Sequence, residues 1–154
     1  MSMTATNPQA HSVSPKGMLI GGQWVESASG ARLTVENPAK KKPIAEVPRG
    51  NAADVDRAVA AATKAYADWR KVPPRERGKA LLKIAEALQA RAEEMARTIA
   101  LETGNALRTQ ARGEANMTAD IFRYFGGLGS ELKGETIPLG EHVLSYTRRE
   151  PLGV

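Results

Sequence analysis

The sequence has 154 residues, the length of one ordinary domain, and its 42% hydrophobic and 25% charged residues lie close to globular averages, which argues against wholesale disorder. The net charge of +5 comes from 22 Lys and Arg interspersed with 17 acids, and only 5% of residues are aromatic, so no nucleic-acid surface is indicated. The absence of cysteine excludes a disulfide, a thiolate metal ligand and a Cys nucleophile within this sequence.

The first 17 residues are small and polar and contain Pro8 and Pro15, which predicts a disordered N-terminal tail over residues 1–17. This tail lacks the apolar centre of a signal peptide, and no apolar stretch approaches the roughly 18 residues of a membrane span. We therefore expect a cytoplasmic protein that binds neither membranes nor nucleic acid.

Short strands are predicted next, at the start of a region that covers residues 18–133. Residues 18–20 and 23–25 flank the glycine turn Gly21-Gly22, which indicates a hairpin. Residues 33–35 and 44–47 are two further short strands, and Pro43 and Pro48 confine the second of them to a sheet edge.

Three amphipathic helices are predicted to follow. Asn51 is the expected N-cap of the first, whose apolar residues recur every three or four positions as far as Trp69. A single long second helix is expected from Pro74 to Gly104. The third is expected from about Thr109 to Phe125, and is broken by the glycines at 126, 127 and 129.

The remaining residues, 134–154, return to extended structure. Strands are predicted over residues 135–139 and 142–149, around a turn at Gly140-Glu141. The sequence then ends on apolar residues 151–154, which we interpret as a cut rather than a natural terminus.

A catalytic constellation is not evident in the sequence. The only histidines, His11 and His142, are far apart, which predicts neither a zinc site nor a Ser-His-Asp system. None of the glycine clusters lies between a strand and a helix, where it could hold a pyrophosphate. The neighbouring acids Glu93 and Glu94 are expected on a solvated helix face, and Asp54 and Asp56 are expected to be helix-start charges. From the residues alone, this is a helix-rich domain with no visible active site.

Several segments, taken in order, resemble NAD(P)-dependent aldehyde dehydrogenases. Residues 19–25 (L-I-G-G-Q-W-V) are similar to the family's I-G-G-x-W-V opening, and residues 35–38 (V-E-N-P) to its V-x-N-P strand ending. Residues 102–106 (E-T-G-N-A) resemble the family's E-T-G-K-P without its Lys-Pro. The most specific match is Gly134 to Pro138 (G-E-T-I-P) followed by residues 149–154 (R-E-P-L-G-V).

The resemblance implies an α/β fold class: the N-terminal portion of the aldehyde dehydrogenase fold, with helices covering a Rossmann-like cofactor domain, short peripheral strands and an oligomerisation-arm hairpin. Such enzymes, betaine-aldehyde and semialdehyde types among them, oxidise an aldehyde to a carboxylic acid through a Cys thiohemiacetal, with NAD or NADP as the hydride acceptor. Their catalytic and cofactor-binding residues follow the P-x-G-V segment. We therefore expect none of them in this chain, and a homo-oligomer, dimer or tetramer, formed through residues 135–149.

A structural monovalent cation, K+ or Na+, is also implied by the resemblance. Its ligands would be the carbonyls of Val35 and Glu36 and the carboxylate of Glu102. The alternative is that Glu102 is simply an acid at a helix end.

Three hypotheses remain open at this point. The chain is the N-terminal fragment of an aldehyde dehydrogenase and inactive alone, or an independently folding, non-catalytic module for binding or oligomerisation, or a basic nucleic-acid-binding helical domain, which is the weakest of the three. The aldehyde substrate and the choice between NAD and NADP are not indicated.

Overall fold

The computed structural model describes residues 17–154, so the predicted disordered tail lies outside the described residues except for Gly17. Strands and helices alternate in blocks along the chain. In order they are β1 (Met18–Ile20), β2 (Gln23–Val25), β3 (Arg32–Asn37), β4 (Lys42–Pro48), α1 (Ala52–Trp69), α2 (Pro74–Ala90), α3 (Ala92–Thr103), the π-helical turn η1 (Leu107–Ala111), α4 (Arg112–Gly127), the 3-10 turn η2 (Leu128–Ser130), β5 (Thr136–Pro138) and β6 (Leu144–Tyr146). The expected helix-rich chain with short strands is confirmed.

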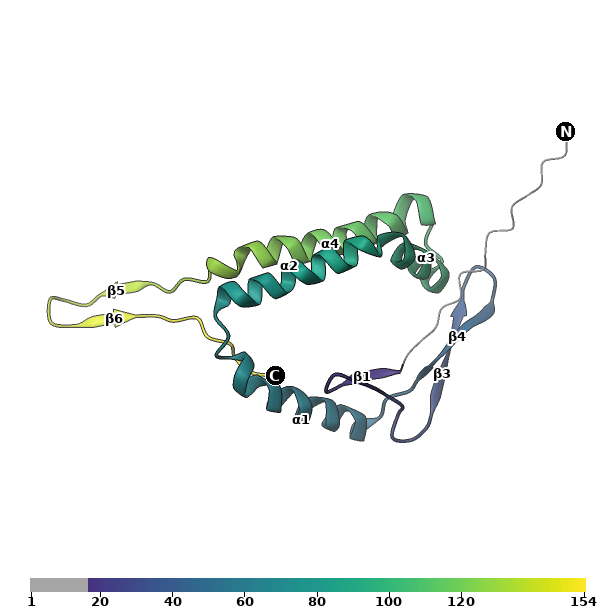
Figure 1. The fold of residues 1–154 in the computed structure, drawn as a ribbon, viewed down its shortest axis with the longest axis horizontal. Helices are drawn as coiled ribbons and strands as arrows, with labels where there is room; N and C mark the ends of the chain where they lie inside the picture. Colours follow the sequence, from purple (N-terminus) through teal and green to yellow (C-terminus); the bar gives the residue numbers. More distant parts are fainter. Residues whose placement is uncertain (1–16) are drawn as a thin grey trace.

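The elements are arranged as an open frame rather than around one central core (Figure 1). Helices α2 and α4 lie side by side and antiparallel, and α3 folds back against the far end of α4. The β5–β6 hairpin projects from one end of this helix pair, and the β3–β4 hairpin lies at the other end. Helix α1 forms the opposite side of the frame, and β1 contacts it.

All strand pairing within residues 17–154 is local, in three separate two-stranded antiparallel sheets. The β1–β2 hairpin turns at Gly21 and Gly22, whose φ angles of 60° and 81° lie in the left-handed region that glycine adopts without strain. The predicted turn is therefore confirmed. The β3–β4 pair is longer than expected and has a register shift between Val35 and Glu36.

The predicted long second helix is wrong, because the chain leaves helical geometry at Arg91 (φ −112°, ψ 15°) and forms α2 and α3 instead. The turn lets α3 bury Ala96 against Ala111 and Ala115. Neither Pro nor Gly lies at the break in the sequence. We attribute the break instead to the packing of small residues between α3 and α4. The end of α3 at Gly104 is confirmed, with φ 77° at the C-cap.

The predicted end of the third helix is confirmed at Gly127, where α4 passes into the 3-10 turn η2, although Gly126 still lies inside the helix. Gly126 is buried against α2. A Cβ added at Gly126 would lie 2.9 Å from Cδ2 of Leu82, and one at Gly78 would lie 2.6 Å from the Gly126 carbonyl oxygen. These glycines therefore allow two helices to approach closely rather than ending one of them.

Glu93 and Glu94 are exposed as expected, and both make ion pairs. Arg112 of α4 donates to both carboxylate oxygens of Glu93 at 2.8 and 2.9 Å, which lowers the pKa of that carboxyl to about 2. Arg91 donates to Glu94 at 2.8 and 2.6 Å across the break between α2 and α3. The first pair joins α3 to α4, and the second supports the turn.

The buried hydrophobic residues of the described chain are all alanines: Ala85, Ala96, Ala111, Ala115 and Ala119. The apolar stripe predicted for α1 is instead exposed, with Val55 59% and Trp69 48% accessible. Tyr124 and Phe125 at the end of α4 stack edge to face, and both remain exposed. The helices therefore fully bury only small residues against each other, while their large apolar residues are half-buried or exposed.

Candidate functional site

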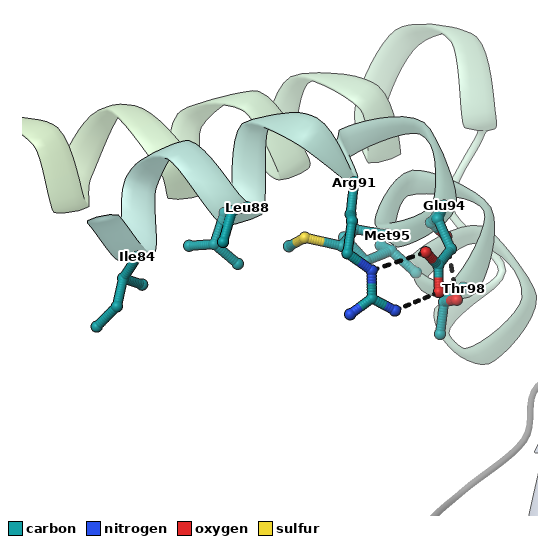
Figure 2. Close-up of a pocket in the computed structure, with 8 residues that line it drawn as sticks. Ile84, Leu88, Arg91, Glu94, Met95 and Thr98 are labelled. Carbon is teal, nitrogen blue, oxygen red and sulfur yellow. Dashed lines mark hydrogen bonds and ion pairs between the residues drawn. The ribbon is translucent and has the colours of Figure 1, made fainter. Parts of the chain in front are cut away.

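An apolar groove follows the face of α2 and α3 that is turned away from α4 (Figure 2). It encloses about 570 Å³ and includes the ion pair of Arg91 with Glu94. Its lining residues are Ile84, Ala87, Leu88, Arg91, Glu94, Met95, Thr98 and Ile99. Apart from this ion pair and Thr98, the lining is apolar.

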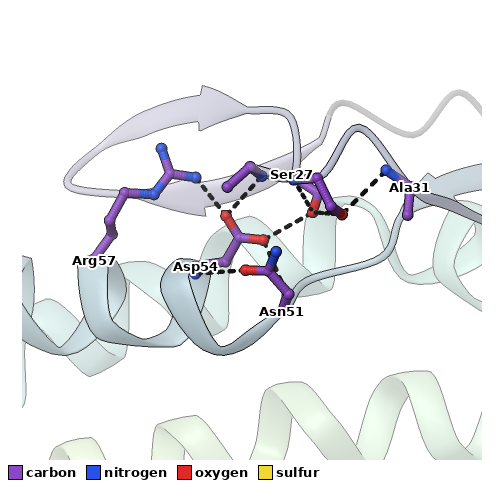
Figure 3. Close-up of polar contacts among 7 residues, drawn as sticks. Ser27, Ala31, Asn51, Asp54 and Arg57 are labelled. Carbon is purple, nitrogen blue, oxygen red and sulfur yellow. Dashed lines mark hydrogen bonds and ion pairs between the residues drawn. The ribbon is translucent and has the colours of Figure 1, made fainter.

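A network of polar contacts surrounds Asp54, in the first turn of α1 (Figure 3). Its side chain is 3% exposed and accepts hydrogen bonds from the Ser27 hydroxyl at 2.8 Å, the Ala28 backbone N–H at 2.9 Å and the Arg57 guanidinium at 2.5 Å. It also accepts from the Asn51 backbone N–H at 2.9 Å, and the Asn51 side chain accepts from the Asp54 N–H in return. These bonds fasten the loop after β2 to the start of α1.

The pKa of Asp54 is held well below its ordinary value, first by the Asn51 backbone N–H and then by the Ala28 N–H. The carboxylate is therefore charged and structural. The prediction of Asn51 as the N-cap is confirmed, but the description of Asp54 as only a helix-start charge is incomplete. The three-residue spacing of Asn51 and Asp54 matches a capping box and could have indicated this role from the sequence. The hydrogen bonds to Ser27 and Ala28 could not have been predicted, because those residues are distant in the sequence.

The residues proposed for a monovalent cation lie on two segments that the fold brings together. Val35, half-buried, and Glu36, exposed, occupy the register shift of β3, while Glu102 is exposed in the last turn of α3. Strand β3 contacts α3, and a Cβ added at Gly104 would lie 3.0 Å from Cγ of Pro38. Among residues 17–154, no group of three or more His, Asp or Glu side chains is arranged to hold a metal ion. Coordination by two carbonyls and one carboxylate stays a prediction.

The β5–β6 hairpin carries the residues expected to mediate oligomerisation. It is shorter than predicted, and its base is closed by the Thr147 N–H donating to the Glu135 carbonyl at 2.9 Å. Leu139, Leu144 and Tyr146 are 62%, 81% and 60% exposed. His142 lies exposed in the turn between the two strands.

The sheets of residues 17–154 differ from the sheet of a dinucleotide-binding domain. A dinucleotide site of the Rossmann type needs parallel strands and a glycine-rich turn leading into a helix, whereas the described sheets are three isolated antiparallel pairs. No helix within this range combines the length and apolar composition needed to cross a membrane.

Comparisons with known proteins agree with one another. A family model described as the aldehyde dehydrogenase family matches residues 24–154. An aldehyde dehydrogenase of Aspergillus niger is 40% identical over 141 residues, which is 91% of this chain and 28% of the relative. The chain therefore spans little more than a quarter of the length of this relative.

Solved structures give the same result. An NAD-dependent aldehyde dehydrogenase from Sinorhizobium meliloti is 33% identical with a TM-score of 0.80, covering 88% of this chain and 28% of its own. PnpE, from Pseudomonas sp. WBC-3 and solved in complex with nicotinamide adenine dinucleotide, is 36% identical with a TM-score of 0.82, covering 85% and 27%.

Proposed function

The chain belongs to the aldehyde dehydrogenase family, and from this we propose that it is the N-terminal part of an enzyme that oxidises an aldehyde to a carboxylic acid with NAD or NADP. The observation that carries the proposal is the match over residues 24–154 together with a fold that superimposes on an NAD-dependent family member. The solved complex of PnpE with nicotinamide adenine dinucleotide supports NAD as the cofactor of the whole enzyme.

Residues 1–154 alone are proposed to be catalytically inactive. The sequence contains no cysteine, so it offers no thiolate to attack an aldehyde carbonyl. The described residues also form no parallel sheet, which supports the proposal that the cofactor site needs other parts of the whole enzyme.

The test is an assay of purified residues 1–154 with NAD+ or NADP+ and a panel of aliphatic and aromatic aldehydes. We expect no reduced cofactor above the rate without protein. Turnover that persists after removal of any co-purifying host dehydrogenase would contradict this proposal. The proposal that the chain is the N-terminal part of an aldehyde dehydrogenase is tested by sequencing the gene beyond codon 154. We expect the reading frame to continue and to encode a cysteine.

Within the whole enzyme, the helices are proposed to cover the cofactor domain. The apolar groove along α2 and α3 supports this, because Ile84 is 42% exposed and most of the other lining residues are apolar. Burying an apolar side chain of this size contributes roughly 1.5–3 kcal/mol, so this face is more stable when covered.

The β5–β6 hairpin is proposed to mediate assembly into a homo-oligomer. Its exposed leucines and its unpaired strand edges support pairing with another subunit. Leu144→Glu in the whole enzyme should lower the oligomeric state seen by light scattering, whereas Leu33→Glu, on the distant β3, should not. Equal effects of both changes would argue against the hairpin as the interface.

The carbonyls of Val35 and Glu36 and the Glu102 carboxylate are proposed to bind K+ or Na+ in the whole enzyme. The contact of β3 with α3 supports this. Exchanging K+ or Na+ for a bulky organic cation should lower the midpoint of thermal unfolding in the wild type and not in Glu102→Gln; equal shifts in both would contradict it.

A further inference from the structure

A strongly basic cavity lies between the α1–α2 corner and the segment that follows β6. It encloses about 330 Å³, and its lining includes five cationic side chains and a single carboxylate. Arg70, Lys71 and Arg77 belong to one wall, and Arg148 and Arg149 belong to the other. The two walls are about 70 residues apart in sequence, so the cavity could not be predicted from a local run of charged residues.

The two walls are held in place by contacts that do not depend on a ligand. The Tyr66 hydroxyl on α1 donates to the Pro151 carbonyl at 2.6 Å, which fixes the distal segment against the helix. The Arg77 guanidinium donates to the Val72 carbonyl at 2.7 Å, and Arg70 stacks over the Tyr66 ring at 5.6 Å. The cavity is therefore preorganised, which lowers the entropic cost of binding.

The positive charge of the cavity is only partly neutralised by the chain. The one lining carboxylate, Glu150, is paired with Arg148 at 3.1 Å. Lys71 pairs with Asp68 at 3.3 Å, but both side chains are more than 70% exposed, so that pair is weak. The Arg149 side chain makes no hydrogen bond or ion pair with residues 17–154, and Arg77 uses one of its five donors.

We propose that this cavity binds a phosphoryl group, carried either by inorganic phosphate or by a small phosphate monoester. Guanidinium groups match the geometry of phosphate oxygens and donate to them in pairs, and here four Arg side chains line one small polar cavity. The volume is at the low end of the range of small-molecule sites, which favours a compact anion. A bound phosphoryl group bridges the α1–α2 corner to residues 148–151, from which the β5–β6 hairpin extends, and so steadies the hairpin.

The test is calorimetric titration of the protein, as its gene encodes it, with inorganic phosphate and in parallel with glycerol 3-phosphate, both at constant ionic strength set by NaCl. We expect saturable binding of at least one of the two. Comparable affinities identify free phosphate as sufficient, and tighter binding of the ester shows that the cavity also contacts the organic part.

The variants are one residue from each wall, Lys71→Gln and Arg149→Gln, with Arg108→Gln as a control that removes one exposed positive charge from η1. Each wall variant should raise the dissociation constant about tenfold, the usual effect of losing one charge-assisted hydrogen bond, while the control changes it less than about twofold. Arg149→Lys should lose less than Arg149→Gln. All four changes are at exposed positions, and thermal melts without phosphate confirm that the variants fold.

Absence of saturable binding of both anions by the wild type would overturn the proposal. So would wall variants that bind like the wild type, or a control that weakens binding as much as they do, since that would show only a general effect of net charge.

Discussion

Asp54 and Asp56 are both acids at the start of α1, yet the structure gives them different roles. Asp54 is buried and accepts four hydrogen bonds, whereas Asp56 is exposed. We expect Asp54→Asn to lower the midpoint of thermal unfolding by several degrees, because an amide cannot accept all of these bonds and leaves buried donors unsatisfied. Asp56→Asn should leave the midpoint unchanged. Scanning calorimetry of the two variants in the whole enzyme measures the difference.

The Asp54 carboxylate also makes the stability of the fold depend on pH. Its pKa in the folded state lies below the ordinary value of 3.8, so its stabilising effect is complete above pH 3.8 and is lost as the pH falls below it. The gap in stability between the wild type and Asp54→Asn should therefore be constant near neutral pH and shrink in acid. A gap that widens in acid would show that the contacts of Asp54 do not favour its charged form.

At the scale of elements, the contact of α2 with α4 depends on glycine. A methyl group at Gly78 would meet the Gly126 backbone carbonyl at 2.6 Å, and neither helix backbone can move without disturbing the other contacts of the pair. Gly78→Ala should therefore destabilise the protein by roughly 1–3 kcal/mol, the usual cost of overpacking.

Gly113 provides the matched control, because it is also helical and a Cβ there would meet nothing within 4 Å. Gly113→Ala should stabilise the protein by about 0.5–1 kcal/mol, since alanine loses less backbone entropy in a helix. Urea titration followed by circular dichroism gives both values. If Gly78→Ala is as stabilising as Gly113→Ala, the close approach of the helices is incorrect.

Elements with a local signal could be predicted from the sequence, and elements set by distant contacts could not. The β1–β2 turn and the capping of α1 follow from Gly21-Gly22 and Asn51, whose effects act within a few residues. The break at Arg91 depends on packing between α3 and α4, so periodicity alone extended the helix through it. Similarly, the basic cavity needs residues 70–77 beside residues 148–151, a pairing that only the fold reveals.

At the scale of the whole molecule, the described residues lack a core of large apolar side chains. Its fully buried hydrophobic residues are alanines, and no large side chain is less than 2% exposed. Leucines at 144 and 152 are 81% and 102% exposed, and the groove along α2 and α3 is open. Antiparallel pairs at both ends of the frame stand free of any larger sheet. These exposed apolar surfaces support the proposal that the frame packs against further polypeptide in the whole enzyme.

We therefore expect residues 1–154, purified alone, to be poorly stable and to associate. Each large apolar side chain left in water forfeits about 1.5–3 kcal/mol of burial, against a typical domain stability of roughly 5–15 kcal/mol, so a few such losses are enough to remove a stable monomer. The unpaired edges of β5 and β6 add a template for pairing with other chains, which the nearby charges of Arg148 and Glu141 blunt only in part. Size-exclusion chromatography with light scattering should show mixed oligomers, and heating should give a broad transition without cooperativity. A monodisperse monomer with one sharp melt would instead favour an independently folding module, because it would show that the alanine-lined helix contacts suffice to hold the frame together.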